Sequence, residues 1–301
     1  MRVGQWGTVL KGVVADVDRN HTMTFAAALS YYFLLSLFPA LIALSAFVSF
    51  LPVPNLFSQM LTLLARFVPP DSMGVVRQIL HDVVNPHRGA LLSFGLLGTL
   101  WTASSGFAGM IEALNVAYNV PETRPYWKTR GLALLMTFLV GGLLLAALGM
   151  MLVGPQFGEW LARVLHASYL WARIWPVVRW AVSGAFIVVA VEAMYFLGPN
   201  VKQRFMHTLA GAVFSVGTWL ALSYALGIYF QRFANFNRTY GALGGAIALM
   251  TWLYWSSFVI LLGAEINSAA LQVAGDETLA LKQPPPEKVK PTAATESDIA
   301  A

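Results

Sequence analysis

The feature that most limits the fold is a long stretch without any charged residue, from Phe25 to Leu51. About 20 apolar residues in a helix cross the hydrocarbon core of a bilayer, because each residue adds about 1.5 Å. A helix of this length in a soluble protein would carry a polar face, and this stretch carries none. It therefore predicts a membrane-spanning helix, and Asp16 and Asp18 just before it favour a retained anchor over a cleaved signal peptide.

The composition extends this prediction to the whole chain. Of the 301 residues, 57% are hydrophobic and only 11% are charged, whereas soluble domains have about 25% charged residues. We therefore predict an all-α, polytopic membrane protein with a single membrane domain. The absence of cysteine excludes disulfides, thiolate metal sites and catalytic thiols. We assign the net charge of +5 to residues that flank spans and meet anionic lipid, rather than to nucleic-acid binding.

Hydropathy divides the chain into a cytoplasmic amphipathic helix (1–24), a six-span membrane domain (25–270) and a disordered cytoplasmic tail (271–301). In the first part, Trp6, Leu10, Val13 and Val17 recur at helical spacing, which favours a helix lying at the membrane interface. The predicted spans are 25–51, 89–111, 131–154, 174–197, 207–230 and 241–267. Between spans, we expect short interfacial amphipathic helices over 52–88, a polar loop over 115–130 and an interfacial loop over 155–173. A full span over 53–68 is less favoured, because this stretch is short.

The distribution of basic residues predicts the orientation. All six lysines and five arginines fall on the side that holds both termini, and the other eight arginines fall on the opposite side. Cytoplasmic loops are enriched in lysine and arginine. We therefore expect a bacterial inner-membrane protein with both termini in the cytoplasm.

Polar residues inside the spans are the candidates for a functional site. Pro39 cannot donate a backbone hydrogen bond to the Leu35 carbonyl oxygen, so this acceptor is left free at membrane depth. The helix is therefore either kinked for purely structural reasons or faces a polar interior. Glu112, Glu192 and Glu265 lie in or at the ends of spans. Because an ionised acid deep in a bilayer costs at least about 2.5 kcal/mol, each is a structural ion pair (with Arg130 or Lys202), a polar or proton-linked site, or exposed to headgroups. The predicted polar pocket contains Tyr31, Tyr32, Ser36, Pro39, Ser105, Glu112, Glu192, Glu265 and Asn267.

Within this pocket, we expect Glu265 to share one polar site near the cytoplasmic interface with Tyr31 and Tyr32. Its candidate donors are the hydroxyls of these two tyrosines and cationic side chains near Arg130 or Lys202. Asn267 is two residues further on and should point elsewhere on the helix. No catalytic or metal-ligand spacing is present, since the P-loop, zinc-protease, nucleophile-elbow and dinucleotide motifs are all missing and the five histidines are scattered. We therefore expect no enzyme activity, no metal and no cofactor.

Four stretches in the same order carry a family resemblance: TFAAALSYYFLLSLFPALIAL, EALNVAYNVPETRPYWKTR, the GPN that ends the fourth span, and TYGALGGAIALMTWLYWSSFVILLGAEINSA. Together they cover about residues 20–270 and resemble the YihY/BrkB family of bacterial inner-membrane proteins. This resemblance implies a six-span helical protein. Members have been linked to virulence or serum resistance and to traffic of envelope lipids or lipopolysaccharide precursors. Some were labelled ribonuclease BN, which the residues here do not support.

The positions that carry the resemblance are Tyr31, Tyr32, Ser36, Phe38, Pro39, Leu114, Asn115, Tyr118, Pro199, Asn200, Tyr240, Gly241, Ala242, Gly244, Gly263, Glu265 and Asn267. Val116 and Phe196 depart from it, because relatives often have basic residues there. If those basic residues hold an anionic headgroup, this chain must use others, and Arg130, Lys202 and Arg204 are the candidates.

These observations favour a transporter or flippase-like protein that handles an envelope lipid or amphiphile. The alternative is a scaffold or assembly factor that organises an envelope complex without transport, and a membrane ribonuclease is third. The expected partners are membrane lipids, with a second copy of the chain or other envelope proteins as further candidates, and not nucleic acid.

Overall fold

The computed structural model describes residues 6–49, 89–164, 168–232 and 242–273, together with Leu61, Thr62, Ala65, Met73, Gly74 and Arg77. The helices with described bounds are α1 (Trp6–Arg19), α2 (Thr22–Ser49), α5 (Gly89–Ala117), α6 (Tyr126–Val164), α7 (Ser168–Leu197), α8 (Phe205–Arg232) and α10 (Ala242–Val273). No extended strand occurs in this part of the chain, so the all-helical class is confirmed there. The helices predicted over 52–88 fall almost wholly outside the described residues, as does the predicted tail beyond Val273.

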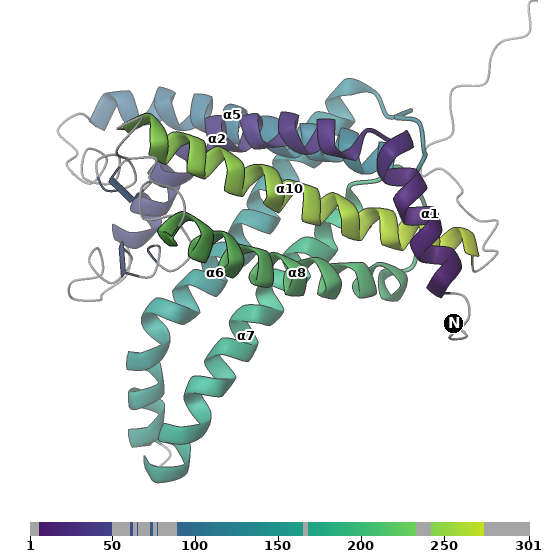
Figure 1. The fold of residues 1–301 in the computed structure, drawn as a ribbon. Coiled ribbons are helices and arrows are strands. Elements are labelled where there is room, and N and C mark those ends of the chain that lie inside the picture. The colour runs from purple at the N-terminus through teal and green to yellow at the C-terminus, as the bar shows by residue number, and fades with distance from the viewer. Residues whose placement is uncertain are drawn as a thin grey trace, which may run out of the picture.

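The helices form a bundle with one projecting hairpin. α2, α5, α8 and α10 run side by side, whereas α6 and α7 cross them and extend away from the bundle as a pair (Figure 1). α6 has 39 residues, which corresponds to a length of about 58 Å. The hairpin is therefore longer than the core of a bilayer is thick.

Four helices in the described ranges are long and apolar enough to cross a membrane: Tyr126–Val164, Ile174–Leu197, Phe205–Phe230 and Gly244–Gln272. They correspond to the last four predicted spans. α2 and α5, with 28 and 29 residues, cover the first two predicted spans as continuous helices. The complete set of six spans remains a prediction.

Two predicted loops are partly helical. α6 continues through Pro155 to Val164, and α7 already begins at Ser168, so the prediction of a loop over 155–173 is wrong. A proline inside a helix costs about 3 kcal/mol, and here α7 packs against the same segment and holds the helix together. The predicted polar loop over 115–130 is also shorter than expected, because α5 continues to Ala117 and α6 starts directly after Pro125. The Pro125 carbonyl oxygen accepts hydrogen bonds from the backbone N–H groups of Lys128 and Thr129 in the first turn of α6.

Small residues set the distance between α2 and α5. A Cβ atom on Gly109 would lie 3.0 Å from the ring of Tyr32, and one on Gly106 would lie 3.3 Å from the ring of Phe33. Both aromatic rings of α2 thus rest on glycines of α5. This agrees with the general role of small residues in helix packing within membranes.

A glycine lets α8 and α10 approach each other closely. A Cβ atom on Gly263 would lie 1.9 Å from the Ser215 hydroxyl, 2.5 Å from the Tyr195 hydroxyl and 2.9 Å from the Gly211 carbonyl oxygen. The Tyr195 and Ser215 hydroxyls are themselves hydrogen-bonded at 2.7 Å. Gly263 therefore provides the space in which α7, α8 and α10 meet.

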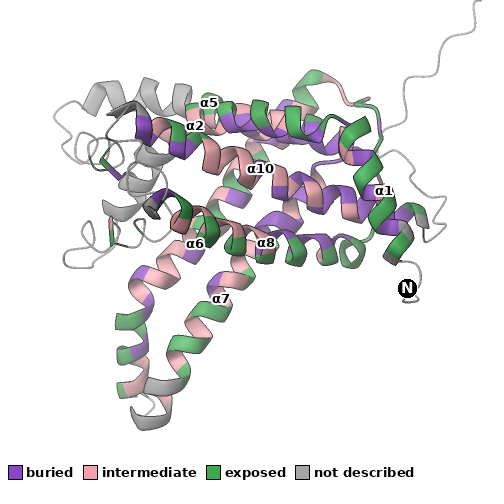
Figure 2. Cartoon of the chain, in the orientation of Figure 1, coloured by how far each residue is buried: buried purple, intermediate pink, exposed green. Residues whose placement is uncertain are grey.

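α1 packs against α10 with one face only (Figure 2). Val9 and Val13 are buried there against Ala269, whereas Leu10 and Val14 are 59% and 73% exposed. The face that packs is therefore rotated from the predicted stripe, which had Leu10 in it. The reason is that this face packs against another helix, α10, and the periodicity of α1 does not show where that helix lies. The placement of α1 at a membrane interface remains a prediction.

Candidate functional site

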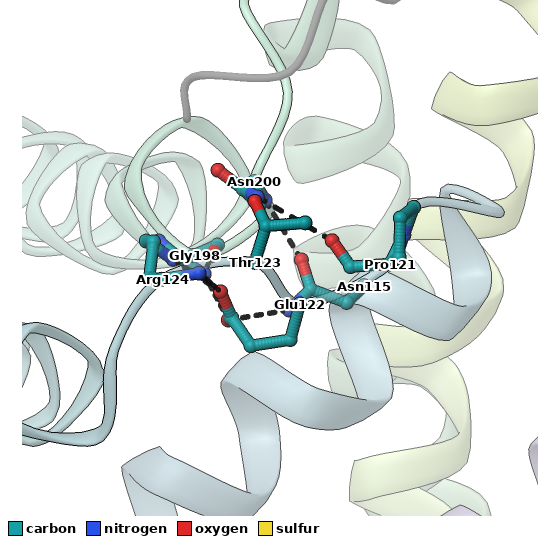
Figure 3. Close-up of polar contacts among 7 residues, drawn as sticks. All are labelled: Asn115, Pro121, Glu122, Thr123, Arg124, Gly198 and Asn200. Atoms are coloured by element: carbon teal, nitrogen blue, oxygen red, sulfur yellow. Dashed lines mark hydrogen bonds and ion pairs between the residues drawn. The ribbon is translucent and has the colours of Figure 1, made fainter. Parts of the chain in front are cut away.

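Two loops at one end of the bundle are locked together by two asparagines (Figure 3). The side-chain oxygen of Asn115 accepts a hydrogen bond from the backbone N–H of Asn200 at 2.7 Å. The side-chain NH2 group of Asn115 donates to the Glu122 carboxylate at 2.8 Å. The Asn200 amide donates to the Thr123 hydroxyl at 2.7 Å. Asn115 and Asn200 are 3% and 0% exposed. We call the group of Asn115, Glu122, Thr123, Arg124, Gly198 and Asn200 the loop clasp.

An arginine completes the loop clasp. Arg124 forms an ion pair with Glu122 at 2.7 Å and also donates to the Gly198 carbonyl oxygen at 2.9 Å. Partial burial by itself would raise the pKa of Glu122, but the hydrogen bonds and charge of Arg124 and the Asn115 amide outweigh it and hold that pKa below its ordinary value of 4.5. The clasp therefore joins the loop between α5 and α6 to the loop between α7 and α8.

The lowered pKa of Glu122 predicts a loss of stability in acid. Its contribution is complete above the unfolded-state pKa of 4.5 and is lost as the pH falls through the lower folded-state value. Because Glu122 is exposed, the effect is small, and we expect acidification from neutral to about pH 3 to lower the melting temperature about 2 °C more for the parent than for Glu122→Gln. Thermal melting in detergent measures this difference. Parallel curves for both proteins would contradict it.

Glu265 is fully buried, and its donors come from the turn between α1 and α2. The Asn20 amide lies 3.1 and 3.2 Å from the two carboxylate oxygens, and the Thr22 hydroxyl lies 3.0 Å from one of them. Asn20 follows α1, and Thr22 is the first residue of α2. The carboxylate thus ties α10 to the start of the first apolar helix.

The structure does not place Tyr31 or Tyr32 among the donors of Glu265. Both side chains are exposed, at 53% and 40%. They follow Thr22 by nine and ten residues, or about 13 to 15 Å along the helix. The sequence signal for the true donors is that Asn20 and Thr22 lie just before the apolar stretch, at a position where such residues often cap helices.

Glu192 is also fully buried, in α7, and forms no ion pair within the part of the chain that the structure describes. The Thr208 hydroxyl donates to one carboxylate oxygen, and the other has no hydrogen-bond partner among the described residues. In the same described part, the Tyr118 hydroxyl and the Gln203 side-chain carbonyl oxygen are also buried without a hydrogen bond. Neither of the considered partners forms an ion pair with Glu192, because Arg130 contacts α5 and Lys202 is exposed.

Asn267 points away from Glu265, as two positions on one helix should. Its amide donates to the Thr208 carbonyl oxygen at 2.9 Å, and its carbonyl oxygen accepts from the Gly211 N–H at 3.0 Å. Asn267 is therefore part of the contact between α8 and α10.

Arg130 and Ser105, two of the predicted site residues, lie together. The Arg130 guanidinium donates to the Trp101 carbonyl oxygen at 2.6 Å and to the Ser105 hydroxyl at 3.3 Å, and it lies over the Trp101 ring, 3.9 Å from its centre. Arg130 is only 9% exposed, and its Nε atom has no hydrogen-bond partner in the described ranges. No carboxylate of the described residues forms an ion pair with it.

The remaining predicted residues lie apart from one another. Glu112, Lys202 and Arg204 are exposed, and Ser36 bonds to the Phe33 carbonyl oxygen within its own helix. α2 continues through Pro39, whose side chain falls outside the described part. The predicted pocket residues are thus distributed over separate contacts: Glu265 with the α1–α2 turn, Glu192 with α8, and Ser105 with Arg130.

Comparisons with known proteins identify relatives over most of the chain. The profile of a family described as Virulence factor BrkB matches residues 13–288. The "Putative ribonuclease-like protein YfkH" of Bacillus subtilis is 35% identical over 259 residues, which is 86% of this chain and 94% of that protein. A UPF0761 membrane protein of Alkalilimnicola ehrlichii is 31% identical over 83% of this chain but only 55% of its own length. Another, from Tolumonas auensis, is 27% identical over 86% of this chain and 84% of its own length.

No solved structure matches the chain. Within the part that the structure describes, no group of three or more histidine, aspartate or glutamate side chains could hold a metal ion.

Proposed function

The chain belongs to the BrkB family of bacterial membrane proteins, and on this premise we propose that it is a six-span inner-membrane protein that transfers an anionic envelope lipid or similar amphiphile between leaflets. Arg130 is the observation that carries this proposal. Its guanidinium stays charged at any physiological pH. Because no acid neutralises it among the described residues, an anion from outside the chain is a suitable partner.

The depth of Arg130 in the bundle supports this assignment. Its partners Trp101 and Ser105 precede the end of α5 by 16 and 12 residues, or about 18 to 24 Å along the helix. If α5 spans the bilayer, the guanidinium lies within the apolar layer, on the side of the loop between α5 and α6, because Arg130 is in the second turn of α6. Cations buried within membrane-spanning segments are costly, and such residues mark pathways for polar groups.

The surroundings of Arg130 leave an approach from the bilayer. Trp101, whose ring stacks on the guanidinium, is 54% exposed. Among the described residues, no atom accepts the hydrogen of the Arg130 Nε atom. A lipid phosphate could take this hydrogen and remain in contact with the exposed apolar surface through its acyl chains.

Reconstitution into liposomes tests the proposed function. Vesicles contain a trace of phosphatidylglycerol with a fluorescent dye on one acyl chain, and a membrane-impermeant reductant bleaches only the outer leaflet. We expect vesicles with the protein to lose more fluorescence than protein-free vesicles, because inner-leaflet lipid reaches the outside. Equal bleaching in both would refute transfer and would favour the scaffold alternative.

Single cysteines test the proposed orientation, because the natural chain has none. Lys202→Cys lies on an exposed position of the loop between α7 and α8 and should react with an impermeant maleimide only after the cytoplasmic side is opened. Ser72→Cys, in the segment between the first two predicted spans, should react in intact cells from the periplasmic side. The opposite pattern would overturn the orientation.

A further inference from the structure

The projecting hairpin of α6 and α7 contains a cavity that the sequence did not predict. Its volume is about 520 Å³, within the range of about 300 to 1,000 Å³ that is typical of sites for small organic ligands. Its lining includes Glu159, Arg163, Trp171, Trp175 and Arg179. The cavity lies more than 20 residues along α6 from Arg130 and its contacts with α5, so it is a separate site.

The walls of this cavity are fixed by close contacts between the two helices. Gly154 and Gly158 of α6 lack the Cβ atoms that would lie 2.5 Å from the Arg179 side chain and 2.2 Å from the Trp175 ring. The indole N–H of Trp171 donates to the Gly158 carbonyl oxygen at 2.9 Å, and that of Trp175 donates to the Gly154 carbonyl oxygen. The cavity is therefore a built feature of the hairpin and not a gap between loosely packed side chains.

The charge of the cavity favours an anion. Arg163 and Arg179 contribute two cations and Glu159 one anion, and none of the three forms an ion pair within the described chain. Arg163 makes one long hydrogen bond of 3.4 Å, to the Glu159 backbone carbonyl oxygen. The Arg179 Nε atom is buried and has no hydrogen-bond partner among the residues that the structure describes. Two guanidinium groups thus have free donors, in the planar arrangement that binds phosphate oxygens in pairs.

The aromatic residues around the cavity favour a lipid over a free ion. Trp171 and Trp175 stack with ring centres 5.2 Å apart. Next to the cavity, Trp160, Val164 and Val177 are 51%, 54% and 69% exposed. Tryptophan is enriched at the level of lipid headgroups, and exposed valines provide contact for acyl chains. An inorganic phosphate would fill only a fraction of the volume and use none of this apolar surface.

We propose that this cavity binds the phosphate-bearing headgroup of an anionic membrane lipid, with Arg163 and Arg179 as the phosphate ligands. The inference rests on the proposed function only in that the hairpin is embedded in a membrane. Arg130 and Arg163 are 33 residues apart on α6, or about 50 Å along the helix. α6 therefore carries a cationic site near each end, separated by more than the thickness of a bilayer core.

Binding to the purified full chain tests this proposal. The protein in detergent is titrated with short-chain phosphatidylglycerol, and the apparent Kd is obtained from the rise in melting temperature. The test variants are Arg163→Gln, at an exposed position, and Arg179→Met, which keeps the aliphatic stem that packs on Gly154. Lys11→Gln, an exposed cation on α1, is the matched control. We expect each test variant to bind about tenfold more weakly, because a charge-assisted hydrogen bond is worth about 1.5 kcal/mol or more, and the control to bind like the parent.

Three outcomes would overturn the proposal. These are unchanged affinity in both test variants, equal protection by short-chain phosphatidylcholine, and equal protection by inorganic phosphate, which would indicate a site for the free ion. If Arg179→Met does not fold, the exposed Arg163→Gln decides alone. Because this assay measures binding and the liposome assay measures transfer, either claim can fail without the other.

Discussion

Replacing Gly263 with alanine should lower the melting temperature of the purified protein by about 8 °C, because over-packing a tight core costs about 3 kcal/mol. The added Cβ would lie 1.9 Å from the Ser215 hydroxyl and 2.9 Å from the Gly211 carbonyl oxygen. The backbone carbonyl cannot rotate away, so α8 and α10 must separate. The Cβ would also overlap the Tyr195 and Ser215 hydroxyls, so their hydrogen bond is disturbed as well.

Gly217→Ala is the matched control for this prediction. Gly217 lies on α8, and a Cβ atom there would meet nothing within 4 Å. Because alanine favours helix over glycine, this variant should melt at the parent temperature or slightly above it. A Gly263→Ala protein that melts like the parent would show that α8 and α10 do not approach as closely as described.

Replacing Asn115 with alanine should be about as damaging, at about 3 kcal/mol or about 8 °C in melting temperature. The backbone N–H of Asn200, which is fully buried, would lose its acceptor, and Glu122 would lose one donor. Two connected loops would be released together. Lys128→Ala, at an exposed position in the first turn of α6, should leave the melting temperature within about 1 °C of the parent value.

A double-mutant cycle separates the loop clasp from two independent contacts. If Asn115 and Asn200 act through one network, Asn115→Ala and Asn200→Ala together should cost less than the sum of the single changes, by about 1 kcal/mol or more. Strict additivity would contradict the clasp as a single unit, even if each single variant were destabilised.

The parts of the fold that depend on local pattern could be predicted from the sequence. The charge-free stretch after Thr22 forms the continuous helix α2, and the last four predicted spans match four long apolar helices. The end of α6 could not be predicted, because Pro155 is a strong local signal for a break. Contacts with Trp175, 20 residues further along the chain, hold the helix together beyond that point.

The candidate site shows the same limit. Glu265 was recognised as a buried acid, but its donor Asn20 is 245 residues away in the sequence, and no periodicity links the two positions. Arg130 and Ser105 were each predicted as site residues, yet only the crossing of α5 and α6 shows that they touch. Asn115 and Asn200 were noted through the family resemblance, while their direct bond depends on how two loops meet.

The α6–α7 cavity was missed for a related reason. Arg163 and Arg179 are among the eight arginines that entered the sequence argument only through the orientation, and Trp171 lies in the predicted interfacial loop over 155–173. Their convergence depends on two glycines, Gly154 and Gly158, on the facing helix. A glycine in an apolar helix is too common to predict a groove without its partner.

The charge dependence of lipid transfer tests the central claim, the proposed role of Arg130, most directly. Liposomes with the parent protein, Arg130→Gln or Lys128→Gln are compared for bleaching of dye-labelled phosphatidylglycerol and of zwitterionic phosphatidylcholine. We expect the parent and Lys128→Gln to transfer phosphatidylglycerol about tenfold faster than phosphatidylcholine, and Arg130→Gln to lose this preference, because a contact between a cation and a phosphate is worth about 1.5 kcal/mol or more. The same preference in Arg130→Gln, or no transfer by the parent protein, would contradict the account.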